Sequence, residues 1–103
     1  MPTATLRGTV IAEATPDEVI HIEGNVYFPP SSVQTAYLTE SPTPYTCPWK
    51  GVCQYWSVTD PASDEVLQDQ AWSYPEPMPS AFDRVGRDFS GYVAFWRDVA
   101  VAE

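Results

Sequence analysis

The 103-residue chain, 44% hydrophobic and 14% aromatic, suits a single domain, residues 1–103, with one modest core. Its formal net charge of −9 repels phosphate-rich polymers, so we expect no nucleic acid among its partners. The sequence has no apolar run of transmembrane length and no signal-peptide pattern at its N-terminus, so we expect a cytoplasmic protein with reduced thiols and no membrane partner.

The N-terminal part of the chain suits short strands. Residues 7–13 predict a first strand. Residues 19–22 and 25–28 flank Glu23-Gly24, and two strand-like runs around such a pair are typical of a β-hairpin. We therefore expect one strand followed by one hairpin.

Residues 30–39 are the only good helix candidate. A proline and a serine stand at the start, where both residue types are favoured. Val33, Ala36 and Tyr37 share one face at helical spacing. The predicted helix cannot extend past Pro42, because proline cannot continue it.

Prolines, 11 in all, concentrate at residues 29–30, 42–48 and 75–79. Proline fixes its own φ and donates no backbone hydrogen bond, so these clusters are expected to break regular structure.

The C-terminal half predicts more strands. Residues 52–59 and 66–74 suit strands, and the turn-forming residues 60–64 between them predict a second hairpin. Residues 91–96 suit a further strand, and residues 99–101 a short edge strand. We therefore expect a mainly β domain with one short helix. An exposed edge strand would give a homodimer a surface to form on, although the sequence leaves the oligomeric state open.

Each of the three longer predicted strands in this half, residues 52–59, 66–74 and 91–96, carries an aromatic face, because side chains alternate along a strand. Cys53 and Tyr55 share a face of one strand, and Trp72 and Tyr74 share a face of the next. Such rings either fill the core or line a cleft with a few polar groups, where a flat or cationic ligand can stack. The same two interpretations apply to all four tryptophans, Trp49, Trp56, Trp72 and Trp96.

The only lysine, Lys50, lies in the segment 46–51 beside a thiol and a tryptophan. Three interpretations of Lys50 stay open: a solvated loop residue, a binder of an anion inside a ligand pocket, or a catalytic lysine with a lowered pKa. Cys47 is a reactive thiol, an apolar filler or a redox partner of Cys53. The single histidine, His21, is expected to face solvent from a strand. Two cysteines and one histidine fall short of a four-ligand zinc site, so no metal and no cofactor are expected.

Four ordered blocks resemble those of one small bacterial family, domain of unknown function four-two-seven, which is sometimes labelled nucleotidyltransferase-like. They are Thr46-Cys47-Pro48-Trp49-Lys50-Gly51, Tyr55-Trp56-Ser57-Val58, Ala71-Trp72-Ser73-Tyr74-Pro75 and Gly91-Tyr92-Val93-Ala94-Phe95-Trp96. The resemblance covers residues 19–97 and implies a β-tent fold, two antiparallel sheets that meet at an angle. Relatives of that fold bind zinc through paired Cys-x-x-Cys motifs, which this sequence lacks, and some bind ligands in an aromatic cage. The sequence also lacks a Gly-Ser motif with paired aspartates, which does not favour the nucleotidyltransferase label.

These patterns lead to one main hypothesis, a domain that binds a small molecule in an aromatic-lined pocket. The predicted ligand-binding residues are Tyr27, Cys47, Trp49, Lys50, Tyr55 and Trp72. Two alternatives stay open: an enzyme that uses Cys47 or Lys50, and a structural or protein-interaction domain without a ligand.

Overall fold

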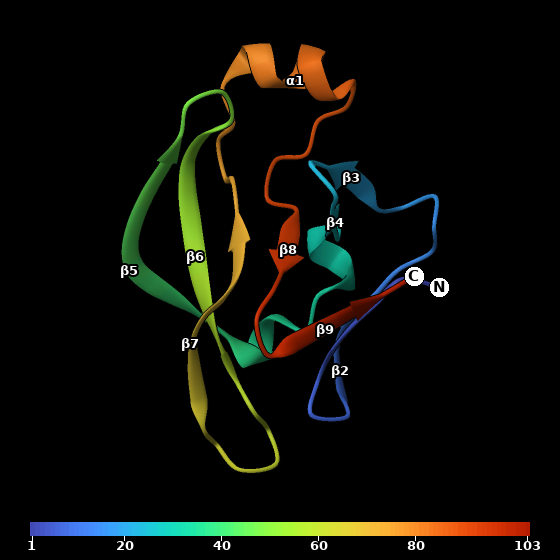
Figure 1. Ribbon diagram of the computed structural model, residues 1–103, viewed down its shortest axis with the longest axis vertical. Helices are drawn as coiled ribbons and strands as arrows, with labels where there is room; N and C mark the ends of the chain where they lie inside the picture. Colours follow the sequence, from blue (N-terminus) through green and yellow to red (C-terminus); the bar gives the residue numbers. More distant parts are fainter.

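The computed structural model describes residues 1–103 and is mainly β (Figure 1). The strands are β1 (Thr3–Leu6), β2 (Thr9–Glu13), β3 (Ile20–Ile22), β4 (Asn25–Tyr27), β5 (Leu38–Cys47), β6 (Gly51–Thr59), β7 (Val66–Ser73), β8 (Val93–Phe95) and β9 (Val99–Ala102). The one α-helix is α1 (Pro79–Val85), and two short 3₁₀ turns, η1 (Pro30–Ser32) and η2 (Thr35–Tyr37), precede β5. No helix is long and apolar enough to cross a membrane.

The strands form three antiparallel sheets. One has the order β2-β1-β9, one is the hairpin β3-β4, and the largest has the order β5-β6-β7-β8. In Figure 1, β9 runs obliquely to the nearly upright β6, and α1 lies beyond the end of the largest sheet. The predicted mainly β class is confirmed, and the two larger antiparallel sheets are accompanied by a third, two-stranded one.

Both predicted hairpins are present. β3 pairs with β4 across Glu23-Gly24, and both turn residues have positive φ, 53° and 81°, as a tight two-residue hairpin turn requires. β6 pairs with β7, with a register shift between Trp56 and Val58. The predicted C-terminal edge strand is also confirmed, because β9 lies at one edge of its sheet beside β1.

The helix predicted over residues 30–39 is wrong. The segment makes two 3₁₀ turns, η1 and η2, and then enters β5. Between the turns, the N–H of Gln34 donates to the carbonyl oxygen of Ile11 at 2.7 Å, and Val33 forms an isolated bridge with Ala12. This backbone pairing with β2 replaces the i to i−4 bonds that an α-helix would need.

The proline cluster at residues 42–48 does not break regular structure as predicted, whereas the cluster at residues 75–79 separates β7 from α1 as expected. Pro42 and Pro44 lie within β5, an edge strand that needs no ladder donor on its outer side, and the register shifts between Glu40 and Pro44. Pro79 begins α1, because the first turn of a helix leaves its N–H groups unpaired anyway. The helix ends at Gly86, whose φ of 86° gives the left-handed cap.

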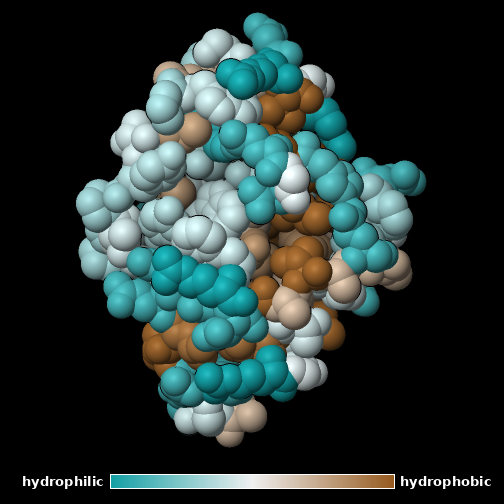
Figure 2. Space-filling view, in the orientation of Figure 1, coloured by the Kyte–Doolittle hydropathy of each residue, from teal (hydrophilic) through white to brown (hydrophobic).

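Two hydrophobic cores lie on opposite faces of the largest sheet. We call the first the aliphatic core; it contains 15 buried residues, among them Phe28, Val58, Ala71 and Val93. We call the second the aromatic core; its 9 buried residues include Tyr27, Cys47, Cys53, Tyr74 and Phe89, with further rings packed at its edge. Figure 2 shows that on one face of the molecule hydrophobic side chains reach the surface only in patches among hydrophilic ones.

Candidate functional site

Six aromatic side chains converge on one cavity of about 250 Å³ at the edge of the aromatic core. They come from β4, β5, β6 and β7 and from the segments that follow β7 and β8. The six are Tyr27, Tyr45, Tyr55, Trp72, Tyr74 and Trp96. Strand alternation explains the grouping on β6 and β7, since Tyr55 and Trp72 are paired neighbours whose side chains leave the sheet on the same face. We call this space the aromatic cavity.

The walls of the aromatic cavity are fixed by ring packing and by indole hydrogen bonds. Tyr55 stacks on Trp96 with ring centroids 6.2 Å apart and 14° between planes, and Trp72 meets Trp96 edge-on at 5.2 Å. The indole N–H of Trp72 donates to the hydroxyl of Tyr27 at 2.9 Å, and that of Trp96 donates to the backbone oxygen of Asp69 at 2.6 Å. Because the ring positions are set before any ligand arrives, little ordering cost remains for binding.

The tight turn between β5 and β6 positions Lys50 at this cavity. Cys47 pairs with Gly51 across the turn, and Gly51 has a φ of 116°, a conformation that favours glycine. The backbone oxygen of Lys50 accepts a hydrogen bond from the N–H of Met78 at 2.9 Å. The segment before α1 therefore fixes the turn from outside.

Lys50 is buried, with only 6% of its side chain exposed, and its ammonium lines the aromatic cavity. The Nζ atom forms an ion pair with Glu23, a residue at the tip of the β3-β4 hairpin. It also lies 4.7 Å from the ring centroid of Trp49 and 5.3 Å from that of Tyr74, within range of cation–π attraction. The hydrogen bond from Lys50 holds the pKa of the Glu23 carboxyl below its ordinary value.

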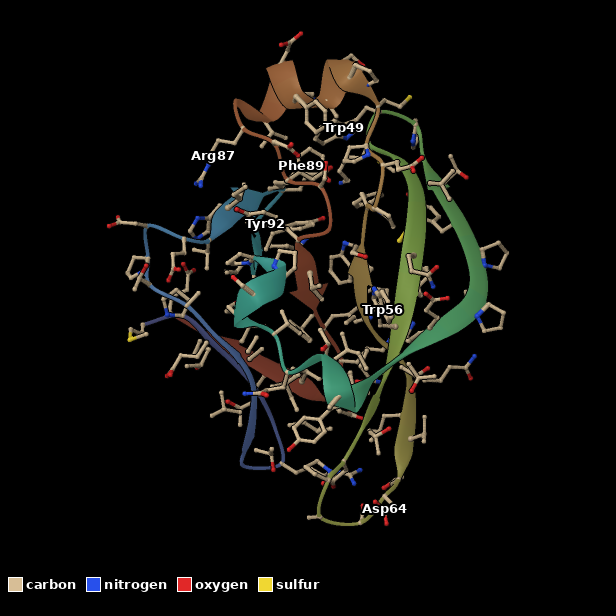
Figure 3. The ribbon with its side chains drawn as sticks, turned by 180° about the vertical axis from the view of Figure 1, so that it is seen from behind. Trp49, Trp56, Asp64, Arg87, Phe89 and Tyr92 are labelled. Carbon is tan, nitrogen blue, oxygen red and sulfur yellow. The ribbon has the colours of Figure 1, made fainter.

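Trp49 borders a neighbouring cavity of about 230 Å³ and does not line the aromatic one. The guanidinium of Arg84, on α1, lies 4.3 Å from the centroid of the Trp49 ring. The indole of Trp49 is therefore within cation–π range of two cations, Arg84 and Lys50. Glu23 borders both cavities, and His21 also lines the second one. Figure 3 shows Trp49 close to α1, whereas Trp56 lies farther down the largest sheet.

The Cys53 thiol does not carry the signs of an activated nucleophile. Cys47 and Cys53 are both free and buried, and only Cys53 lines the aromatic cavity. Burial raises the pKa of Cys53 to about 11, so this thiol is protonated at neutral pH and is a weak nucleophile. The one histidine, His21, is exposed as predicted and pairs with Glu103 at 2.5 Å.

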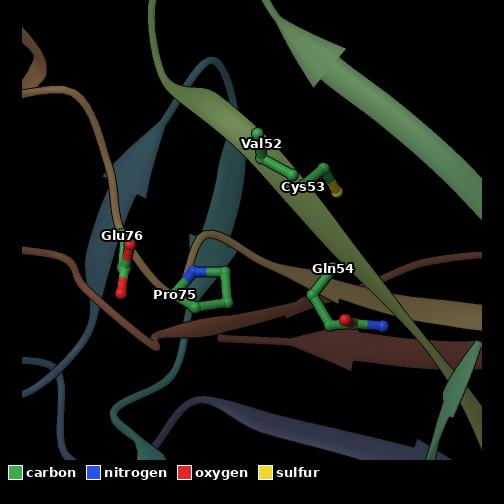
Figure 4. Close-up of a pocket in the computed structure, with 5 residues that line it drawn as sticks. All are labelled: Val52, Cys53, Gln54, Pro75 and Glu76. Atoms are coloured by element: carbon green, nitrogen blue, oxygen red, sulfur yellow. The ribbon is translucent and has the colours of Figure 1, made fainter.

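The rest of the molecule has no candidate site with as many converging aromatic and charged side chains. No group of three or more His, Cys, Asp or Glu side chains gathers as ligands around a metal ion would. A cavity of about 210 Å³ opens between β6 and Pro75-Glu76 (Figure 4), but no aromatic ring lines it. A fourth cavity, of about 230 Å³, is bordered by Trp56 and Leu38 beside the aliphatic core, and no charged side chain lines it.

The structure brings four of the six predicted ligand-binding residues together at the aromatic cavity, namely Tyr27, Lys50, Tyr55 and Trp72. Trp49 lies one cavity away, and Cys47 packs inside the aromatic core without lining the space. The prediction omitted six lining residues, Glu23, Asn25, Tyr45, Cys53, Tyr74 and Trp96. Tyr74 could have been found, since alternation places it on the same face as Trp72. Tyr45 could not have been found in this way, because the prolines before it hide the strand β5 in the sequence.

Comparison with known proteins agrees with the resemblance seen in the sequence blocks. None of the curated proteins matches the chain significantly. The sequence model of one family, described as Domain of unknown function (DUF427), matches residues 3–103, which is nearly the whole chain. By this match the chain belongs to that family.

Proposed function

We propose that this protein is a binding module for a small, flat molecule, which it holds in the aromatic cavity against Tyr55, Trp72 and Trp96. The observation that supports the proposal is the convergence of six aromatic rings and one buried ammonium on a single cavity of about 250 Å³. Ligand sites are mostly apolar walls with a few placed polar groups, and this cavity has that composition.

The size of the cavity limits the ligand. Pockets for drug-sized molecules span about 300–1,000 Å³, so a space of about 250 Å³ suits a molecule of one or two fused rings. Such a ring would lie against the indoles of Trp72 and Trp96, which meet edge-on and so present faces in two directions. An aromatic contact of this kind contributes about 0.5–1.5 kcal/mol beyond the burial of its area.

The proposal is tested by NMR titration of the four indole N–H signals with a neutral probe, 3-methylindole. We expect the signals of Trp72 and Trp96 to shift with a saturable dependence on probe concentration, because both rings line the cavity. Trp56 is the internal control, since it packs on the aliphatic core on the opposite face of the sheet. Shifts of equal size in all four signals, or none in any, would contradict the proposal.

A further inference from the structure

Lys50 is an incompletely satisfied cation in a buried position. An ammonium group carries three N–H donors, and Glu23 is the one acceptor within hydrogen-bonding reach of Nζ. The rest of its surroundings are the faces of Trp49 and Tyr74, which attract a cation but accept no conventional hydrogen bond. A buried charge is costly unless it is paired and hydrogen-bonded, so this ammonium has capacity for a better anionic partner.

Glu23 differs from Lys50 in its freedom to move. Its side chain is 56% exposed, against 6% for Lys50, and it stands at the tip of a hairpin of three-residue strands. A carboxylate that leaves the ion pair therefore returns to water at little cost. Arg84 borders the neighbouring cavity together with Glu23 and is close enough to help lower the pKa of the Glu23 carboxyl, so a second cation is available to Glu23.

We infer that Glu23 occupies, in the free protein, the position that a carboxylate of the ligand takes on Lys50, so that the aromatic cavity selects small aromatic acids. The inference rests on the proposed function and names its ligand class. The space next to Nζ already accommodates a carboxylate, that of Glu23, in hydrogen-bonding geometry. The ring attached to the incoming acid would lie against the aromatic walls, while Glu23 moves into solvent.

The sign of the protein's charge does not exclude an acid. The net charge is −9, but at physiological ionic strength charges farther apart than about 8 Å are largely screened. Within the aromatic cavity Glu23 is the only carboxylate, and its displacement leaves Lys50 as the local charge. An aromatic amine would instead place a second cation beside the Lys50 ammonium, and like charges at such short range repel.

Three probes that share one ring system test the inference: indole-3-acetate, tryptamine and 3-methylindole, titrated by NMR as above. We expect the wild-type protein to bind the acid about tenfold more tightly than the amine, because a charge-assisted hydrogen bond forms only with the acid. Glu23→Gln removes the competing charge and should raise the ratio of the affinity for the acid to that for 3-methylindole about threefold or more. Lys50→Met should lower the affinity for the acid to that for 3-methylindole.

The outcomes separate the inference from the proposed function. Suppose that 3-methylindole binds, but that Glu23→Gln lowers the affinity for indole-3-acetate relative to that for 3-methylindole or that tryptamine binds most tightly. The displaced-carboxylate inference is then wrong, and the proposed binding function stands. Equal affinity for all three probes would likewise show that the inference is wrong and leave the binding function standing. If none of the three shifts the Trp72 signal, both are overturned. Glu23→Gln keeps a side-chain oxygen that can accept a hydrogen bond from Lys50, so folding is expected to persist, and the far-ultraviolet circular dichroism spectrum verifies it.

Discussion

The two faces of the largest sheet are built from different chemistry. The aliphatic core is made of alanine, valine, leucine and isoleucine with two phenylalanines, and several members, such as Leu6, Ile11 and Val58, have no exposed surface. The aromatic core contains fewer buried residues, and its edge is made of partly exposed rings such as Tyr55 and Trp72. The aromatic face ends in a cavity lined by rings and a lysine, whereas the cavity beside the aliphatic core has no charged side chain.

The difference follows from what the side chains carry. An aliphatic group has no polar atom, so it can be removed from water completely. A buried tyrosine hydroxyl or indole N–H needs a hydrogen-bond partner, and the pairing of Trp72 with Tyr27 meets that need for one pair. Rings whose polar ends face outward can pack on a core and still border a solvent-reachable space. We therefore expect the aliphatic core to supply most of the stability, while the aromatic core supplies the candidate site.

The strongest test of this division is Phe28→Ala. Phe28 has no exposed surface, and its ring packs edge-on against Phe95 at 5.8 Å, so truncation should lower the free energy of unfolding by about 3–5 kcal/mol. Urea unfolding measures the loss. Val66→Ala is the control, because Val66 is 60% exposed and its truncation should change stability by less than about 0.5 kcal/mol.

If Phe28→Ala does not fold, Phe28→Leu replaces it, with a smaller expected cost of about 1 kcal/mol. Similar losses for Phe28→Ala and Val66→Ala would mean that the aliphatic core does not dominate stability.

The second test uses pH, because of the two cores only the aromatic one has titratable side chains among its buried members. Burial raises the pKa of Cys53 to about 11 and that of Tyr27 to about 12. In the unfolded chain these groups release their protons at lower pH, so between about pH 9 and pH 12 ionisation favours unfolding and stability falls as pH rises. Cys53 alone should contribute about 2 kcal/mol of this loss by pH 11.

Urea unfolding of wild type and Cys53→Ala at pH 8, 9, 10 and 11 measures the contribution of the thiol. The wild type should lose about 2 kcal/mol more than the variant between pH 8 and pH 11. Parallel pH dependence of the two proteins would show that Cys53 ionises as readily in the folded state as in the unfolded chain.

The sequence predicted the fold best where local and long-range preferences agree. β6 and β7 have alternating or β-favouring residues, and the turn between them contains Asp60 and Pro61, so the hairpin was predictable. The segment 30–39 has helical spacing, but its backbone pairs with β2, a contact that local spacing does not contain. Prolines were a poor guide for β5, because their effect depends on whether the N–H they lack would have had a partner.

The candidate site was predictable only in part, for a related reason. Alternation grouped Tyr55 with Cys53 on one strand and Trp72 with Tyr74 on the next, and local geometry determines both groupings. Which faces meet is determined by tertiary structure: Tyr27 reaches Trp72 across 45 positions, and Glu23 reaches Lys50 across 27. The lone lysine attracted attention through composition, whereas its exposed partner Glu23 is one of 14 acidic residues and has no distinguishing signal in the sequence.

The finest test compares two tryptophans on opposite faces of the same sheet. The indole N–H of Trp72 donates to Tyr27 at 2.9 Å, and that of Trp56 donates to the hydroxyl of Ser73 at 3.0 Å. Replacing either indole with phenylalanine removes one such bond and should cost about 1 kcal/mol of stability in urea unfolding. The two variants are therefore matched in fold energetics.

They should differ in binding. Trp72→Phe takes ring area from the wall of the aromatic cavity and frees Tyr27 from its indole donor, so the affinity for 3-methylindole should fall about fivefold. Trp56→Phe changes only the side of the sheet that carries the aliphatic core and should leave that affinity unchanged. If both variants bind 3-methylindole with the same affinity, the rings of the aromatic core serve packing alone. The two faces of the sheet would then differ in composition but not in function.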